Sequence, residues 1–194
     1  MKKIELSDVK LGAHYERIRP QFRARVIREK ERRRVQVGDA VSLHFENRDT
    51  VLFQVQEMVR IEHITEADKV QHEIDTYNQL LPGKGDLSAT LFIEVTDADQ
   101  IKPVLDRLQG IDRGRKVFVR FDGQRVAGVF EAGYSTDVKL SAVHYVRFPF
   151  TPAQMERFAA AQDVAVVIEH PGYKAEAPVP PRTHAALIAD LAAR

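Results

Sequence analysis

The residues best suited to chemistry lie between Glu46 and His63, where carboxylates, amides and guanidiniums alternate with large apolar side chains. Polar groups beside a core need hydrogen-bond partners, so such a block is rarely a neutral surface. Four of its side chains, three residues apart, are candidates for lining one ligand pocket: Gln54, Glu57, Arg60 and His63. The alternative is a structural network that includes an intrahelical Glu–Arg ion pair.

A second set of residues has the spacing of metal ligands. Asp68, His72 and Asp75 are four and three residues apart, so an expected helix carries two carboxylates and an imidazole on one face. The Glu-x-x-His and His-Glu-x-x-His patterns of di-iron and zinc sites are absent from the sequence. A solvated helix face is therefore the competing interpretation.

His144 is a further ligand candidate, expected on a strand beside Val146 and Phe148, with Tyr145 and Arg147 on the other face. A core histidine whose ring nitrogens find partners is the plainer interpretation. No nucleophile-elbow or phosphate-loop motif occurs, and the chain has no cysteine. No cofactor is indicated by a motif, and the sequence leaves open whether the protein is an enzyme.

The charge of the chain is concentrated near its N-terminus. Nine Lys or Arg residues and two Glu residues between Arg17 and Arg34 give this segment +7, so the remainder of a chain with net charge +1 carries −6. Such a segment can dock an acidic protein partner or pack on its own acidic body. The partner-binding candidates are Arg23, Arg25, Arg28 and Arg32. Since the arginines flank an apolar stripe and no aromatic platform is interleaved, nucleic acid is not the expected partner.

The elements that must position these residues follow from periodicity. Leu11, Tyr15, Ile18, Phe22 and Val26 form one helical stripe, and Pro20 predicts a kink or two helices meeting at Arg19. Residues 49–63 fit a helix capped by Asp49 or Thr50, or a strand that pairs with the one before it. The helix is favoured because Gln56, Glu57 and Met58 are good helix formers.

The rest of the chain predicts an α+β fold. Strands are expected at 35–37 and 41–45, and a helix begins at a Thr65–Asp68 capping box and runs to about Leu81. Strands at 87–95, 116–121, 125–131, 138–150, 164–168 and 173–177 alternate with helices at 97–108, from 152, and at 182–193. This order predicts a mainly antiparallel sheet in the C-terminal half, with helices packed on it and a helical N-terminal segment.

Length and composition indicate one soluble domain over residues 1–194. It contains a basic helix at about 11–34, a helical region at 49–81, a sheet-rich region at 87–178 and a C-terminal helix. Met1–Glu5 has no apolar run behind its lysines, and no stretch has the length of a membrane span. A cytoplasmic protein that does not bind a membrane is expected.

Four segments carry a resemblance to a known family: Phe45–Thr50, Gln54–Met58, Leu87–Glu94 and Ser141–Phe148. Over nearly its whole length the chain is similar to a bacterial family catalogued as domain of unknown function 3501. The resemblance implies an accessory role in redox or peroxide metabolism, beside a rubrerythrin-like or iron–sulfur oxidoreductase-like partner. Without cysteine, the chain would need a partner or a bound cofactor for such a role.

Two hypotheses follow. The first is a non-catalytic binding or assembly protein that docks an acidic partner through the basic helix. The second is an enzyme or small-ligand sensor that uses Gln54, Glu57, Arg60 and His63, together with His144.

Overall fold

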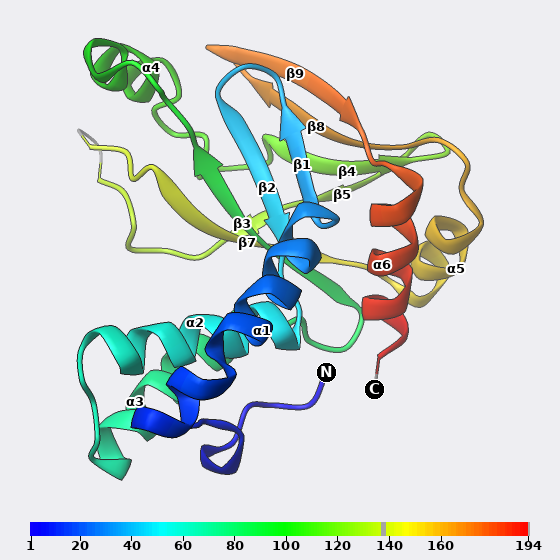
Figure 1. Cartoon of the computed structure of the whole chain (residues 1–194). Coiled ribbons are helices and arrows are strands. Elements are labelled where there is room, and N and C mark those ends of the chain that lie inside the picture. The colour runs from blue at the N-terminus through cyan, green and yellow to red at the C-terminus, as the bar shows by residue number, and fades with distance from the viewer. Residues whose placement is uncertain (137–138, 194) are drawn as a thin grey trace.

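The computed structural model describes residues 1–136 and 139–193, and these form two antiparallel sheets and a group of N-terminal helices (Figure 1). The first sheet has the order β1-β2-β3-β7-β6. Its strands are β1 (Arg34–Val37), β2 (Val41–Phe45), β3 (Asp86–Ile93), β7 (Val143–Pro149) and β6 (Val129–Phe130). The second sheet has the order β5-β4-β8-β9. Its strands are β5 (Gln124–Ala127), β4 (Val117–Phe121), β8 (Val164–His170) and β9 (Tyr173–Pro178).

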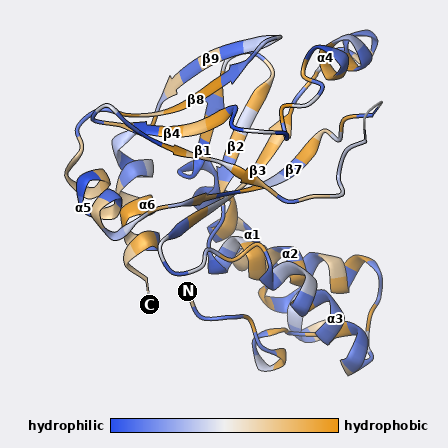
Figure 2. Cartoon of the chain, turned by 180° about the vertical axis from the view of Figure 1, so that it is seen from behind, coloured by the Kyte–Doolittle hydropathy of each residue, from blue (hydrophilic) through white to orange (hydrophobic). Residues whose placement is uncertain are grey.

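The two sheets share one apolar core. Side chains alternate across a strand, so Leu43 of β2 and Leu91 of β3, which are paired in register, point to the same face. Val119 of β4 and Val166 of β8 are paired in the same way in the second sheet. All four side chains are fully buried in a single cluster. Figure 2 shows the corresponding concentration of apolar residues on the strands.

The N-terminal helices have a smaller core of their own. α1 (Gly12–Glu31), α2 (Arg48–Ile61) and α3 (Ala67–Asn78) follow a short 3-10 turn, η1 (Leu6–Asp8). Val51 and Val55 of α2 pack with Val70 and Ile74 of α3, and Tyr145 of β7 packs against this cluster from the sheet. The helices thereby cover one end of the first sheet, on the face that points away from the core shared by the two sheets.

The other helices lie around the sheets. They are η2 (Ala98–Gln100), α4 (Ile101–Arg107), α5 (Pro152–Ala160) and α6 (Pro181–Ala192). Leu187 of α6 and Phe158 of α5 are buried in the large core. Within the described residues, no helix combines the length and the apolar character needed to cross a membrane.

The α+β class and the helical N-terminal segment are confirmed, whereas confining the sheet to the C-terminal half is wrong. The hairpin of β1 and β2 belongs to the first sheet because β2 pairs with β3 along its whole length. There are also two sheets instead of one. After β5, the chain leaves the second sheet at Gly128 and continues as β6 in the first sheet. A Cβ added at Gly128 would lie 2.7 Å from the Val146 side chain. This close approach lets the chain cross from one sheet to the other.

The polar block folds as a helix, as favoured from its composition. The cap, however, is Asn47, whose side chain accepts from the Thr50 backbone N–H while the Thr50 hydroxyl accepts from the Asn47 N–H. Thr50 is therefore the third helical residue and not the cap, and Asp49 lies in the first turn.

Other predicted boundaries also differ. α1 runs unbroken through Pro20, which is exposed, so the lost backbone bond is open to water. α3 begins after Glu66, and the Thr65 hydroxyl bonds to Glu66 and does not cap the helix. The predicted helix at 97–108 is divided into η2 and α4. The predicted strand at 138–150 is β7, and its expected start at Val138 lies outside the described residues.

Candidate functional site

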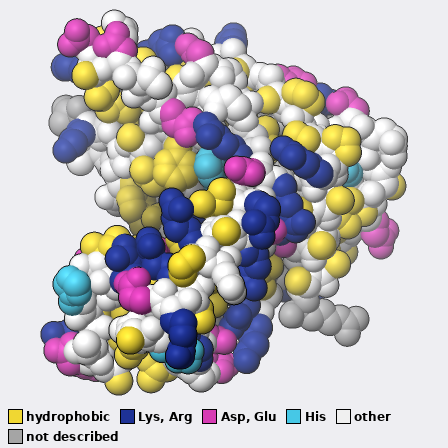
Figure 3. Space-filling view, viewed as in Figure 1, with side chains coloured by type: hydrophobic (Ala, Val, Ile, Leu, Met, Phe, Trp, Pro, Cys, Tyr) yellow, Lys and Arg dark blue, Asp and Glu magenta, His cyan; other side chains and the backbone are white. Residues whose placement is uncertain are grey.

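Arginines form a stripe along one exposed face of α1. Arg17, Arg25, Arg28 and Arg32 are eight, three and four residues apart, so they fall on one face of a helix with 3.6 residues per turn. The sequence-based description of the arginines as flanking the apolar stripe therefore misses that these four share one face. Arg23, two residues before Arg25, points to another side of the helix. Lys and Arg side chains gather over the region where Figure 1 places α1 (Figure 3).

Two members of this arginine stripe have ion pairs and two have none. Arg32 Nε lies 2.8 Å from Glu29, and an Arg25 guanidinium nitrogen lies 3.3 Å from Asp49. Arg17 and Arg28 are exposed and have no hydrogen-bond or ion-pair partner in the described part of the chain. Their charges are therefore available to another molecule.

Arg19 points toward α2 and is fully engaged there. Its guanidinium donates two hydrogen bonds of 2.8 Å to the Glu57 carboxylate, which also accepts from the Tyr15 hydroxyl at 2.7 Å. The Arg19 hydrogen bonds lower the pKa of Glu57 to about 2. Glu57 thus holds α1 against α2, and its carboxylate is not free to bind a ligand.

Arg33 is engaged in the same way at the end of the helix. Its side chain is 3% exposed and forms a two-bond ion pair with Asp190 of α6. Glu29 also bonds Arg33, and it accepts from the Asn47 side chain at 2.9 Å. Burial raises the pKa of Asp190, and the Arg33 guanidinium opposes that rise. The pair ties the basic segment to the C-terminal helix.

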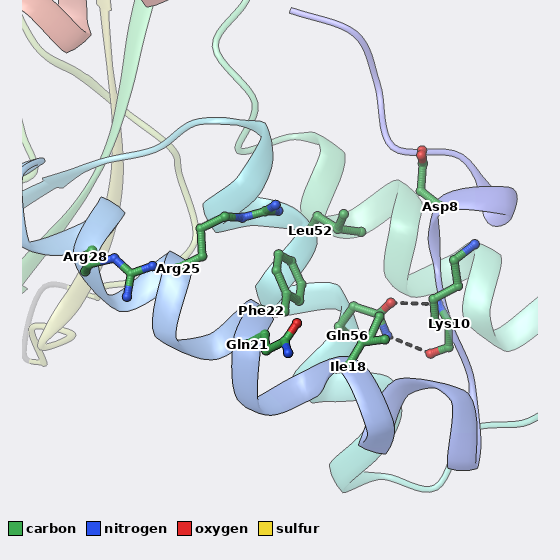
Figure 4. Close-up of a pocket in the computed structure, with 9 residues that line it drawn as sticks. All are labelled: Asp8, Lys10, Ile18, Gln21, Phe22, Arg25, Arg28, Leu52 and Gln56. Atoms are coloured by element: carbon green, nitrogen blue, oxygen red, sulfur yellow. Dashed lines mark hydrogen bonds between the residues drawn. The ribbon is translucent and has the colours of Figure 1, made fainter.

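A cavity of about 490 Å³ lies beside the stripe, between α1, α2 and the segment before α1 (Figure 4). It is lined by Asp8, Lys10, Ile18, Gln21, Phe22, Arg25, Arg28, Leu52 and Gln56. Phe22 packs edge-on against Phe53 with ring centres 5.7 Å apart, and the Arg25 guanidinium lies 5.1 Å from the Phe22 ring centre. The cavity therefore combines an apolar floor with a cationic rim.

The wall formed by the N-terminal segment is fixed by α2. Gln56 is 2% exposed and bonds both backbone groups of Lys10, accepting from its N–H at 2.6 Å and donating to its carbonyl at 2.7 Å. The Asp8 carboxylate accepts hydrogen bonds from the Glu5 backbone N–H and from Arg48, and both lower the pKa of Asp8. The one acidic side chain in the lining is thus neutralised by a cation.

The four predicted pocket residues of the polar block do not meet in one site. Gln54 donates at 3.3 Å to Glu46, on the side of α2 that faces the first sheet. Arg60 contacts Glu57 at 3.4 Å and, with His63 and Tyr15, lines a separate cavity of about 190 Å³. Three residues are less than the 3.6 residues of one helical turn, so each successive side chain is rotated around the helix axis. Over the nine residues from Gln54 to His63, the four side chains therefore come to face different sides.

Glu46 is the buried centre that the sequence did not single out. Its side chain accepts hydrogen bonds from Thr50, Gln54 and Thr90, and the residue is 4% exposed. Thr90 belongs to β3, so this carboxylate joins α2 to the first sheet. A buried carboxylate with several donors is a structural hub in this setting.

His144 is a core residue, 1% exposed, and its Nε2 lies 2.8 Å from the Ser141 carbonyl. Burial lowers its pKa. Its Nδ1 lies 4.0 Å from Asp112, too far for a hydrogen bond, and has no other partner among the described residues. Its neighbours are Phe130 and the loop at Asp112, so it does not share a site with the polar block.

The predicted metal ligands remain surface residues. Asp68 and His72 line a shallow depression with Glu62 and Glu73, while the Asp75 carboxylate accepts from Gln71 at 2.9 Å. Across residues 1–136 and 139–193, no three His, Asp or Glu side chains are arranged to hold a metal ion. Helical spacing alone therefore does not assemble a ligand set here.

Several residues of the site carry no local sequence signal. Asp190 is 157 residues from Arg33, and Lys10 is 46 residues from Gln56. The spacing of Arg17, Arg25, Arg28 and Arg32 is the signal that could have been read, because it repeats at helical intervals beside the apolar stripe.

The chain belongs to the family described as Protein of unknown function (DUF3501), whose model matches residues 3–191. A crystal structure of a novel protein of unknown function from Burkholderia pseudomallei K96243 is similar to it. The two share 34% sequence identity over 98% of this chain and 100% of that chain, with a TM-score of 0.90. No curated protein matches the sequence. The family and fold are thus defined without an activity attached to them.

Proposed function

We propose that the protein is a non-catalytic binding or assembly protein that docks an acidic protein partner on the arginine stripe of α1. The observation that carries this proposal is the division of the arginines along α1 and the turn that follows it. Arg19 and Arg33 neutralise internal carboxylates, whereas Arg17 and Arg28 are exposed with no partner in the described chain. A cation that stabilises no internal contact is available for an external one.

The surroundings of the stripe favour a protein over a nucleic acid. Asp49 of α2 pairs with Arg25 of the stripe, and the apolar side chains of Ile18, Phe22 and Leu52 line the cavity beside it. A phosphate backbone is bound by an uninterrupted row of cations, whereas protein interfaces combine arginine with aromatic and aliphatic contacts. The family resemblance adds the partner classes: a rubrerythrin-like or an iron–sulfur oxidoreductase-like protein.

The proposal is tested by binding of poly-L-glutamate and of duplex DNA to purified wild-type protein and to R17E/R28E. These two substitutions break no ion pair, so the fold should persist, and circular dichroism checks it. We expect poly-L-glutamate binding to weaken at least about tenfold in R17E/R28E. The control is R23E, which reverses one exposed, unpaired arginine on another side of α1; it should bind like the wild type, whereas R28E alone, with the same change in charge, should bind more weakly.

Two results would contradict the proposal. Equal binding of poly-L-glutamate by the wild type and a folded R17E/R28E would exclude the stripe as the docking surface. Tighter binding of duplex DNA than of poly-L-glutamate, lost in R17E/R28E, would assign the stripe to nucleic acid. A purified rubrerythrin-like protein is the next probe, because it tests the partner class that the resemblance implies.

A second candidate function is binding of a small anion between Arg60 and His63. Both residues line the 190 Å³ cavity, and His63 has a positive φ of 52°, which is uncommon for a residue other than glycine. Native mass spectrometry of protein purified without chelators tests it. A bound small-molecule mass that is lost in R60A supports this function, and a mass equal to that of the bare chain leaves the docking proposal ahead.

A further inference from the structure

The cavity beside the arginine stripe, here called the α1–α2 pocket, is built to hold more than a charge. Its volume of about 490 Å³ falls in the range of ligand pockets. Its floor is the half-buried apolar surface of Ile18, Phe22 and Leu52. Half-buried apolar side chains in a concave surface gain free energy when another apolar group covers them. The pocket therefore suits an apolar group from a partner.

The rim of the pocket fixes the charge of what enters. Arg28 has no partner in the described residues, and Lys10 stands on the opposite wall (Figure 4). Arg25 extends over the Phe22 ring, and one of its guanidinium nitrogens lies 3.3 Å from Asp49, which leaves its other nitrogens for a second carboxylate. Asp8 contributes little negative potential because Arg48 pairs with it. The pocket thus complements an apolar group flanked by carboxylates: the floor matches the apolar group, and the cationic rim matches the carboxylates.

The walls of the pocket are fixed before anything binds. Gln56 clamps the Lys10 backbone from α2, and Glu57 holds α1 against α2 through Arg19 and Tyr15. Little conformational entropy is then lost on binding, since the pocket does not have to form.

We infer that the α1–α2 pocket receives a leucine or phenylalanine side chain from an acidic amphipathic helix, whose neighbouring carboxylates bind Arg25 and Arg28. This inference rests on the proposed docking function and names the segment of the partner that is recognised. A groove between helices with apolar anchors and a charged rim is the usual receptor for an amphipathic helix. The charge complementarity of Arg25, Arg28 and Lys10 selects an acidic helix over a basic one.

The test uses three labelled peptides of equal length and the intact protein. The first carries Leu and Phe at helical spacing with Glu at the other positions. The second has Ala in place of Leu and Phe, and the third has Gln in place of Glu. Fluorescence anisotropy gives each dissociation constant. We expect the first peptide to bind at least about tenfold more tightly than either of the others.

Two protein variants separate the anchor from the charge. Q21F fills the pocket from an exposed position without changing charge, and Gln21 has no hydrogen-bond partner in the described structure, so the fold should persist. We expect Q21F to weaken the first peptide about tenfold and to leave the second peptide unchanged. R28E should weaken both, and R23E should weaken neither.

The outcomes distinguish this inference from the docking proposal. If the first two peptides bind equally, are weakened by R28E and are unaffected by Q21F, the anchor is wrong and the acidic docking surface stands. If the third peptide binds as tightly as the first, the pocket takes apolar segments regardless of charge, which overturns both. If the first peptide does not bind, the inference is wrong, and the poly-L-glutamate experiment decides the docking proposal separately.

Discussion

The sheets and the N-terminal helices are stabilised in different ways. The sheets enclose one continuous apolar cluster that reaches from Val35 to Leu191. The helices have a smaller cluster, supplemented by polar tethers: Tyr15 and Arg19 to Glu57, Gln56 to Lys10, and Arg33 to Asp190. A small core needs such additional contacts, because it buries too little apolar surface to order three helices by itself.

This difference separates structural arginines from available ones. Along α1 and the turn after it, some arginines have an internal ion-pair partner and others have none. Arg17, Arg23 and Arg28 have no partner among the described residues, whereas Arg19 and Arg33 do, and of the three only Arg17 and Arg28 lie on the arginine stripe. This contrast supports our proposal that a partner binds the helical part, while the sheets form the scaffold.

The largest expected effect comes from breaking the tether between the two parts. D190A leaves the buried Arg33 guanidinium without its main partner and should lower the free energy of unfolding by about 3 kcal/mol. Urea denaturation measures it. In R33M/D190L both charges are replaced by apolar groups, and most of the loss should be recovered. A D190A protein as stable as the wild type would show that the pair does not tie the parts together.

A smaller effect is expected from the carboxylate between α1 and α2. E57Q removes the charge that Arg19 and Tyr15 bind and should cost about 2 kcal/mol. Hydrogen exchange should show faster opening of α1 and α2 while β3, β4 and β8 keep their protection. Equal acceleration in the strands would mean that the two parts do not open separately.

The same carboxylate predicts a pH dependence. The pKa of Glu57 is about 2 in the folded protein and 4.5 as its ordinary value, so its ionised form stabilises the fold. The contribution is complete above about pH 4.5 and is lost as pH falls through about 2. The difference in stability between wild type and E57Q should shrink over this window, as urea titrations at several pH values can show. A difference that stays constant would contradict the Arg19 bond.

The N-terminal tether should have a local effect. Q56A removes two hydrogen bonds to the Lys10 backbone and should cost about 1–2 kcal/mol. Faster exchange is expected at residues 6–12, with binding of the acidic amphipathic peptide weakened because one wall of the pocket is released. Unchanged exchange there would show that other contacts hold the segment.

The smallest effect on the free energy of unfolding is expected from protonation of His44 on β2. Burial lowers the pKa of His44 to about 4 from an ordinary 6.5, so the unfolded chain binds the proton more readily. Stability should fall by about 1 kcal/mol as pH drops from 6.5 to 4, and this part should be absent in H44Q. Because burial also lowers the pKa of His144 and His170, only the difference between wild type and H44Q isolates the contribution. An imidazole NMR titration with an ordinary midpoint would refute it.

The sequence predicts local structure better than it predicts the site. The alternation along β7 and the helix formers in α2 are local signals, and both elements form. The division into two sheets depends on Gly128 approaching Val146, which no local pattern encodes. The α1–α2 pocket likewise has walls from three segments. Glu57 looked like a free ligand candidate in the sequence because its structural partner, Arg19, lies 38 residues away and no local pattern links the two. Long-range pairing decides which polar residues are left free.

Hydrogen exchange of the wild-type protein, with and without the acidic amphipathic peptide, tests the central claim most directly. If the peptide binds between α1 and α2, exchange should slow at residues 8–12, 18–28 and 48–56, with the strands of both sheets unchanged. Slower exchange on the strands, with α1 and α2 unaffected, would contradict the assignment of binding to the helices.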